Sequence, residues 1–123
     1  MVDYIHNNKT AMMFSGAGAL GAIAAGASSQ KIAEMTIFGL KVCLGFQIAD
    51  DILDLTATSE QLGKTAGKDT KQGKATYPAI VGVEKSQIAA EKLADEAIRL
   101  LESFGDEASL LRGLTFMLLN RTK

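Results

Sequence analysis

A long helical repeat of apolar residues, from about Gln30 to Leu55, constrains this chain more than any other feature of its sequence. Apolar or small side chains recur every three or four residues, at Ile32, Met35, Phe38, Gly39, Val42, Gly45, Phe46, Ala49 and Leu53. Because this spacing places them on one face of an α-helix, the pattern predicts a long helix whose apolar face is packed against other elements. Ser28 and Ser29 precede the repeat and are suitable N-caps.

The rest of the chain is also typical of helices, because alanine and long aliphatic residues dominate and runs of β-branched residues are absent. Further helices are predicted from about Lys9 to Ala25, from Pro78 to Val83, from Ser86 to Ser103, and from a capping Asp106 to about Asn120. In the last helix we expect the buried side chains to be Leu110, Leu111, Leu114, Met117 and Leu118. The sequence therefore predicts an all-α fold of about five helices, in one domain over residues 1–123.

The stretch from Ala11 to Ala27 allows other interpretations, which its composition disfavours. It is too rich in glycine and too weakly apolar for a secretory signal or a membrane span, since a span needs about 20 strongly apolar residues. Gly16 to Gly21 spells GxGxxG, but that motif indicates dinucleotide binding only between a strand and a helix. The residues before it have poor strand composition, so we expect a helix of small residues that a neighbouring helix approaches closely.

Three aspartates and a glutamine lie on one side of the long helix, near its end. Asp54 lies four residues after Asp50 and three after Asp51, and Gln47 precedes them by one turn, so these side chains lie on one side of the helix. Since like charges repel and aspartate is a poor helix former, we expect a cation in front of the cluster. Carboxylates at this spacing suit Mg²⁺, which is commonly shared between one or two carboxylates and substrate phosphates. A solvated acidic face is the alternative that this pattern alone leaves open.

The segment that follows, from Gly63 to Lys74, is basic, rich in glycine and without sustained periodicity. Its lysines are Lys64, Lys68, Lys71 and Lys74. A basic loop after an acidic helix fits a metal-chelated polyphosphate, because the metal binds some of the oxygens and the ammonium groups bind the others. The alternatives are a solvated loop or non-specific contact with nucleic acid. Without interleaved aromatic residues the latter is weak, and we expect no nucleic-acid partner.

Overall composition narrows the partners and the compartment only slightly. The formal net charge is −1, so global charge predicts no partner. The single cysteine, Cys43, lies in an apolar run, cannot form an internal disulfide and is interpreted as a small buried hydrophobe. A free cysteine is compatible with a reducing compartment, and we predict a cytoplasmic protein without a membrane span.

Several short patterns occur in a fixed order along the whole chain. HNNKT, at residues 6–10, matches an HxxKT motif, and GFQIADDILD, at residues 45–54, matches an aspartate-rich motif. GK, KD and GKATYP follow between residues 63 and 78, and the chain ends in a segment from Phe104 to Arg121. Together these patterns resemble the C-terminal half of a trans-type polyprenyl diphosphate synthase, the family that includes the geranylgeranyl and farnesyl diphosphate synthases. The family's first aspartate-rich motif is absent, so we interpret residues 1–123 as a partial polyprenyl synthetase domain.

The resemblance implies an isoprenoid-synthase helical bundle, a homodimer in the complete enzyme, and Mg²⁺-dependent condensation of an allylic diphosphate with isopentenyl diphosphate. The metal ligands that it implies are Asp50, Asp51 and Asp54. The implied diphosphate contacts are Lys9, Lys64, Lys68 and Lys74. The implied catalytic residues, beside the developing allylic carbocation, are Lys9, Thr10 and Gln47.

Two alternatives stay open beside chain elongation. The first is a non-catalytic subunit or a decayed fragment of a prenyl synthase, because the first aspartate-rich motif is missing while the ligand-type residues are retained. The second is a terpene cyclase, which also uses an aspartate-rich face and Mg²⁺, although the FQxxDD and KxTYP patterns favour elongation. Product length stays open as well, because in this family it is set mainly by residues before the first motif.

Overall fold

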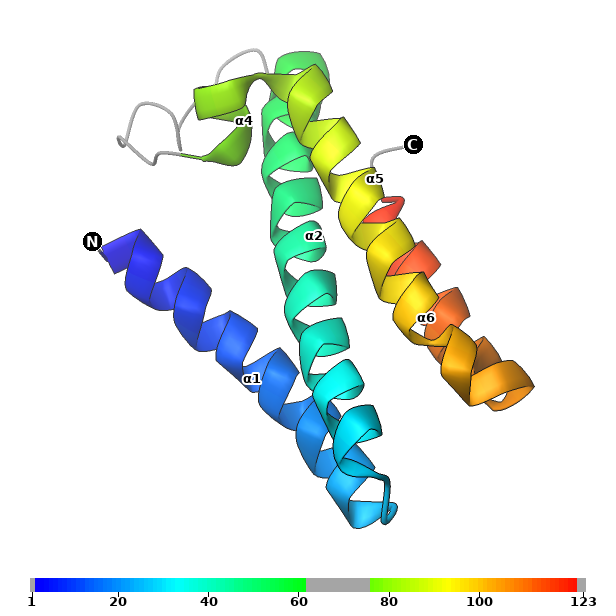
Figure 1. The fold of residues 1–123 in the computed structure, drawn as a ribbon. Helices are drawn as coiled ribbons and strands as arrows, with labels where there is room; N and C mark the ends of the chain where they lie inside the picture. The colour runs from blue at the N-terminus through cyan, green and yellow to red at the C-terminus, as the bar shows by residue number, and fades with distance from the viewer. Residues whose placement is uncertain (1, 62–75, 122–123) are drawn as a thin grey trace.

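The computed structural model describes the backbone of residues 2–61 and 76–121, and the side chains of residues 8–57 and 76–121. Within these ranges the chain is helical and contains no strand (Figure 1). The α-helices are α1 (Val2–Ala24), α2 (Ser29–Gln61), α4 (Tyr77–Val81), α5 (Val83–Leu100) and α6 (Ser109–Leu119), and a 3₁₀ helix, η1 (Glu102–Ala108), lies between the last two. The predicted all-α fold is confirmed.

The long helix α2 lies at the centre of the structure, with α1 on one side and α5 running beside it on the other (Figure 1). Its packed residues belong to two apolar clusters. The first consists of Phe38, Val42, Ala97, Leu101 and Ala108. The second consists of Ile48, Ile52 and Ala90. The predicted apolar face of the 30–55 segment packs at Phe38, Val42 and Ala49, and Cys43 is fully buried beside it. Towards the end of α2 the buried side chains are Ile48 and Ile52, whereas Leu53, which was predicted to pack, is only half-buried.

Glycines bring α1 and α2 into unusually close contact. A Cβ atom on Gly18 would lie 2.3 Å from the backbone oxygen of Met35, and one on Gly39 would lie 2.3 Å from that of Phe14. Real Cβ atoms do not approach an oxygen so closely, so only glycine permits this spacing of the two helices. The GxGxxG pattern lies inside α1, where no strand precedes it. The expected helix of small residues is confirmed, and the structure gives no support to dinucleotide binding.

One of the predicted N-caps is confirmed, and several helix boundaries differ from the predicted ones. Ser28 caps α2, because its Oγ accepts a hydrogen bond from the backbone N–H of Lys31 at 3.3 Å. Pro78 lies in the first turn of α4, as predicted. However, α1 begins at Val2 and not near Lys9, and α2 continues to Gln61.

The chain between α4 and α6 also differs from the prediction in detail. Gly82, with a φ of +92°, ends α4, and α5 begins at once at Val83 rather than at Ser86. Asp106 does not cap the last helix, because it lies within η1 and no side chain bonds to the start of α6. Gly105, with a φ of +65°, forms the bend that lets the chain turn back towards α2.

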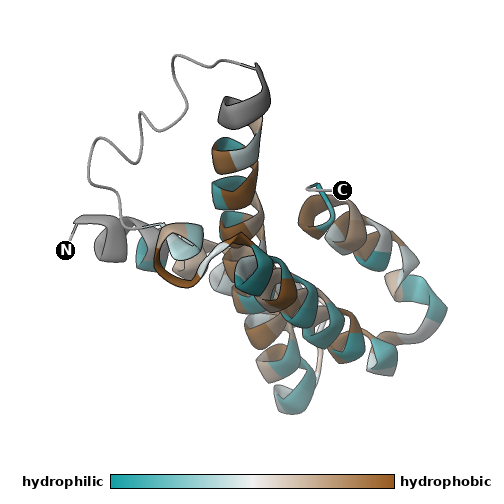
Figure 2. Cartoon of the chain, turned by 90° about the horizontal axis from the view of Figure 1, so that it is seen from above, coloured by the Kyte–Doolittle hydropathy of each residue, from teal (hydrophilic) through white to brown (hydrophobic). Residues whose placement is uncertain are grey.

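The buried face of α6 is narrower than predicted. Leu110, Leu111, Leu114 and Met117 are 83%, 37%, 44% and 62% exposed, although we expected them to be buried. Thr115 and Leu119 are buried instead, because α6 contacts α2 and α5 through a single stripe. By contrast, α5 has a regular buried stripe of Ser86, Ala90, Ala94 and Ala97. Figure 2 shows that hydrophilic and hydrophobic residues alternate along the helices. An apolar hollow of about 760 Å³ lies between α1, α2, η1 and α6.

Among the described residues, one helix is long and apolar enough to cross a membrane, namely α2 over Ser29–Ala57. Length and composition are weak evidence here, because the core helix of a water-soluble bundle meets the same criterion. In this structure α2 packs against α1, α4, α5 and α6. The absence of a membrane span stays a prediction.

Candidate functional site

The aspartate-rich end of α2 borders a groove of about 710 Å³, whose other walls are α4 and α5. The residues that α2 contributes are Leu44, Gln47, Ile48, Asp50, Asp51 and Asp54. The opposite walls are formed by Thr76, Tyr77, Ile80, Ala89, Lys92, Leu93 and Glu96. The structure thus places Gln47 and all three predicted metal ligands along one groove, as their helical spacing predicted. Asp54 is exposed, whereas Asp50 and Asp51 are half-buried.

Asp50 has a cationic partner from a distant part of the chain. Arg121, which follows α6, donates a hydrogen bond from Nη1 to Oδ1 of Asp50 at 2.9 Å. The guanidinium group of Arg121 also lies over the ring of Phe46, with Cζ 5.2 Å from the ring centroid. The cation expected in front of the aspartate cluster is therefore supplied, at Asp50, by the protein itself.

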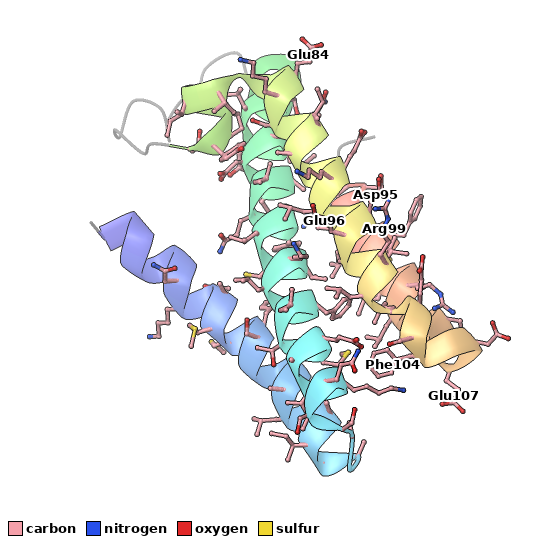
Figure 3. The ribbon with its side chains drawn as sticks, viewed as in Figure 1. Glu84, Asp95, Glu96, Arg99, Phe104 and Glu107 are labelled. Atoms are coloured by element: carbon pink, nitrogen blue, oxygen red, sulfur yellow. The ribbon has the colours of Figure 1, made fainter. Side chains whose placement is uncertain are left out.

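A second charged contact ties the α5 wall of the groove to α2. Lys41 donates a hydrogen bond from Nζ to Glu96, and Lys92 Nζ lies 3.9 Å from the same carboxylate. Figure 3 shows Glu96 on the side of α5 that faces α2, whereas Asp95 points away. The hydrogen bond from Lys41, followed by the positive charges of Lys41, Lys92 and Arg99, lowers the pKa of Glu96. Glu96 is compensated by these partners, and its hydrogen bond with Lys41 links α5 to α2.

The remaining predicted site residues are not brought to this groove. Lys9 and Thr10 are exposed on α1 and do not belong to the groove lining. Figure 1 shows why: α1 and α2 separate towards the end of α2 that carries the aspartates. Lys64, Lys68 and Lys74 lie outside the described residues. The roles of all five stay predictions.

The donor set of the groove fits a shared metal but not a closed metal cage. Within the described part of the chain, no group of three or more His, Cys, Asp or Glu side chains is placed to hold a metal ion. Mg²⁺ does not require one, since it keeps several waters and is bound through one or two carboxylates together with substrate phosphates. The partly exposed carboxylates of Asp50, Asp51 and Asp54 are oxygen ligands of the type that Mg²⁺ prefers.

Sequence reasoning missed several residues of this site. Arg121 was assigned to the closing segment of the chain. Its pairing with Asp50 was missed because the two residues are 71 positions apart and no local spacing links them. Lys92 and Glu96 lie within the predicted 86–103 helix but were not among the predicted site residues. Tyr77 and Thr76 were noticed as part of the GKATYP pattern, but their position opposite the aspartates follows from the packing of α4.

Comparison with known proteins identifies the family. The model of the polyprenyl synthetase family matches residues 2–112. A heterodimeric geranylgeranyl pyrophosphate synthase large subunit 2 from Arabidopsis thaliana is 43% identical over 123 residues, which cover 99% of this chain and 33% of that protein. A dimethylallyltranstransferase from Fischerella ambigua (strain UTEX 1903) is 40% identical over 121 residues, covering 98% of this chain and 35% of that protein. A chloroplastic geranylfarnesyl diphosphate synthase from Leucosceptrum canum is 47% identical over 103 residues, covering 84% of this chain and 28% of that protein.

The helical arrangement of residues 2–61 and 76–121, with its aspartate-lined groove, is typical of the isoprenoid synthases. The match over most of its length shows that this chain belongs to the polyprenyl synthetase family. The chain spans about a third of the length of the curated relatives it matches. The three relatives described above are named as prenyltransferases.

Proposed function

We propose that this chain provides the second aspartate-rich motif of a prenyl diphosphate synthase site, where an allylic diphosphate condenses with isopentenyl diphosphate in a Mg²⁺-dependent reaction. Membership of the polyprenyl synthetase family supports the reaction class, and the names of the relatives support prenyl transfer. The observation that carries the proposal is the groove in which Asp50, Asp51, Asp54 and Gln47 lie together.

The chemistry requires stabilisation of negative charge on a leaving diphosphate. The bond between the allylic C1 and the diphosphate oxygen breaks, the double bond of isopentenyl diphosphate supplies the electrons of the new carbon–carbon bond, and a proton is lost. In this proposal Asp50, Asp51 and Asp54 hold Mg²⁺, which when bound neutralises charge on the leaving group. Gln47 borders the same groove and presents a carbonyl oxygen, a neutral acceptor suited to a neighbouring positive charge.

The basic residues of the proposal come from other segments. Lys9, Lys64, Lys68 and Lys74 bind phosphate oxygens through their ammonium groups, as fixed positive charges that act on the departing pyrophosphate. Thr10 lies beside Lys9 and offers an oxygen lone pair near the developing allylic cation. These residues are proposed on the match of HNNKT and of the basic loop to the family's motifs.

The proposed homodimer follows the same resemblance, whereas the proposed location rests on the free cysteine, Cys43. We propose a homodimer for the complete enzyme and a cytoplasmic location. The printed name of one relative describes a heterodimeric large subunit, so pairing with a second, different chain is the specific alternative. Analytical ultracentrifugation of the purified chain, alone and with candidate subunits, distinguishes these assemblies.

Thermal unfolding with MgCl₂ and inorganic pyrophosphate tests the site directly. A ligand present at about 100 times its dissociation constant stabilises the folded state by about 2.7 kcal/mol. For a chain of this size, that corresponds to a rise in Tm of about 10 °C. Asp50→Asn should abolish most of this rise, whereas Asp95→Asn, which removes a carboxylate that points away from α2, should leave it unchanged.

Two results would count against the proposal. If neither Mg²⁺ with pyrophosphate nor Mg²⁺ alone raises the Tm, the groove does not bind a metal-chelated diphosphate, and a helical bundle with a solvated acidic face becomes the better description. If the rise survives Asp50→Asn, the binding site lies elsewhere in the chain.

A further inference from the structure

The contact of Arg121 with α2 has two parts that the proposed reaction does not use. Its guanidinium group donates to Oδ1 of Asp50 at 2.9 Å, and it lies 5.2 Å from the ring centroid of Phe46. Phe46 and Asp50 are four residues apart on α2, so they lie one above the other on the same helix face. One guanidinium group therefore contacts both a carboxylate and a neighbouring aromatic ring.

The packing of α6 holds Arg121 in this position. Leu119, two residues before it, is 4% exposed and packs against α2 at Gly45. A Cβ on Gly45 would lie 2.8 Å from Cδ2 of Leu119, so the missing side chain at Gly45 provides the space that Leu119 fills. Asn120 then ends α6, with its backbone N–H bonded to the carbonyl oxygen of Phe116. The end of α6 is thereby fixed against α2 at Gly45, five residues before Asp50.

We propose that Arg121 is a built-in counter-ion of Asp50, which neutralises and orients this carboxylate in the absence of a divalent cation and is displaced when Mg²⁺ binds. The inference rests on the proposed role of Asp50 as a metal ligand. Both cations use the same carboxylate, so binding of one weakens binding of the other. After displacement from Asp50, the guanidinium group still contacts the ring of Phe46, because a ring face attracts a cation independently of the carboxylate.

The strength of the ion pair suits such an exchange. The side chains of Arg121 and Asp50 are 41% and 44% exposed, so water screens their attraction. Loss of an exposed pair of this kind changes an equilibrium constant about 1.4- to 5-fold. We therefore expect Arg121→Gln to tighten Mg²⁺ binding by about that factor, because the carboxylate no longer has to release a competing cation.

The test is a titration of the isotopically labelled chain with MgCl₂ alone, followed by nuclear magnetic resonance. The dissociation constant is measured from the amide shifts of Asp50 and Asp51. The Nε–H resonance of Arg121 in the unsubstituted chain reports on its own release and should move with the same dissociation constant. Arg121→Lys keeps the positive charge and should bind Mg²⁺ close to the unsubstituted affinity, whereas Arg99→Gln removes the same charge from α5 and controls for net charge.

The possible results separate this inference from the proposed function. Binding that is lost in Asp50→Asn, together with tighter binding in Arg121→Gln only, supports both. Binding that depends on Asp50 but is unchanged in Arg121→Gln, with an Arg121 Nε–H resonance that does not move, overturns the counter-ion role and leaves the proposed function intact. An unsubstituted chain that binds no Mg²⁺ overturns both. If Arg121→Gln does not fold, the Arg121 Nε–H resonance of the unsubstituted chain still shows whether Mg²⁺ displaces Arg121.

Discussion

The close contact of α1 and α2 makes a sharp prediction about two glycines of the same helix. A Cβ on Gly18 would lie 2.3 Å from the backbone oxygen of Met35 and 3.1 Å from its carbonyl carbon, whereas one on Gly16 would meet nothing within 4 Å. Because the obstructing atoms belong to the backbone, no change of rotamer relieves the clash. The substitution Gly18→Ala therefore forces α1 and α2 apart.

The two substitutions should have clearly different effects on the free energy of unfolding. Alanine is favoured over glycine in a helix by about 0.8–1.0 kcal/mol, so Gly16→Ala should stabilise the chain by about that amount. Gly18→Ala gains the same propensity, but overpacking of a close contact costs about 1–3 kcal/mol. The Gly18 variant should therefore be about 1–3 kcal/mol less stable than the Gly16 variant. For this size of chain the difference corresponds to about 4–12 °C in Tm.

Thermal and urea unfolding, followed by far-ultraviolet circular dichroism, measure this difference. The Gly16 variant is the matched control, because it makes the same chemical change in the same helix without the contact. If both variants are stabilised alike, the backbones of α1 and α2 do not approach as described, and the packing explanation of the GxGxxG segment is wrong.

Two further predictions concern buried and paired groups. The hydrogen bond from Lys41 lowers the pKa of Glu96 below its ordinary value of 4.5, so the stabilisation it gives is present above that pH and is lost as the pH falls through the lowered pKa. Glu96→Gln should therefore lose less stability than the unsubstituted chain between neutral and acid pH, as measured by urea midpoints, with exposed Glu102→Gln as control. Burial raises the pKa of the Cys43 thiol and leaves it with no exposed surface. We expect it to react with Ellman's reagent only as fast as the chain unfolds, and rapid reaction in the folded state would contradict its burial.

The fold was largely predictable because its signals are local. The apolar period of the 30–55 segment, the capping Ser28 and the position of Pro78 in a first turn depend only on neighbouring residues, and all three are confirmed. The side chains assigned to the core of α6 were not predictable in the same way. A helical period predicts which residues share a face, but burial depends on whether another element covers that face, as the exposed Leu114 shows.

The candidate site shows the same division. The helical spacing of Asp50, Asp51 and Asp54 was enough to predict that they share one groove. The pairing of Asp50 with Arg121 was not predictable from spacing, because it depends on how α6 returns to α2 through the bend at Gly105. The metal role of the aspartates and the roles of the lysines stay predictions, since they concern a ligand.

The aspartate cluster gathers three like charges at one end of α2. Arg121, partly exposed to water, compensates Asp50, and Asp51 and Asp54 lie along the same groove. An aspartate side chain has a low helix propensity and repels its neighbours, so such a cluster costs stability. On a solvated acidic face the repulsion serves no purpose. A site for a divalent cation and a diphosphate requires the carboxylates to lie close together. Asp51→Asn and Asp54→Asn should therefore each reduce the rise in Tm that Mg²⁺ with pyrophosphate produces, whereas on a solvated face neither substitution would change that rise.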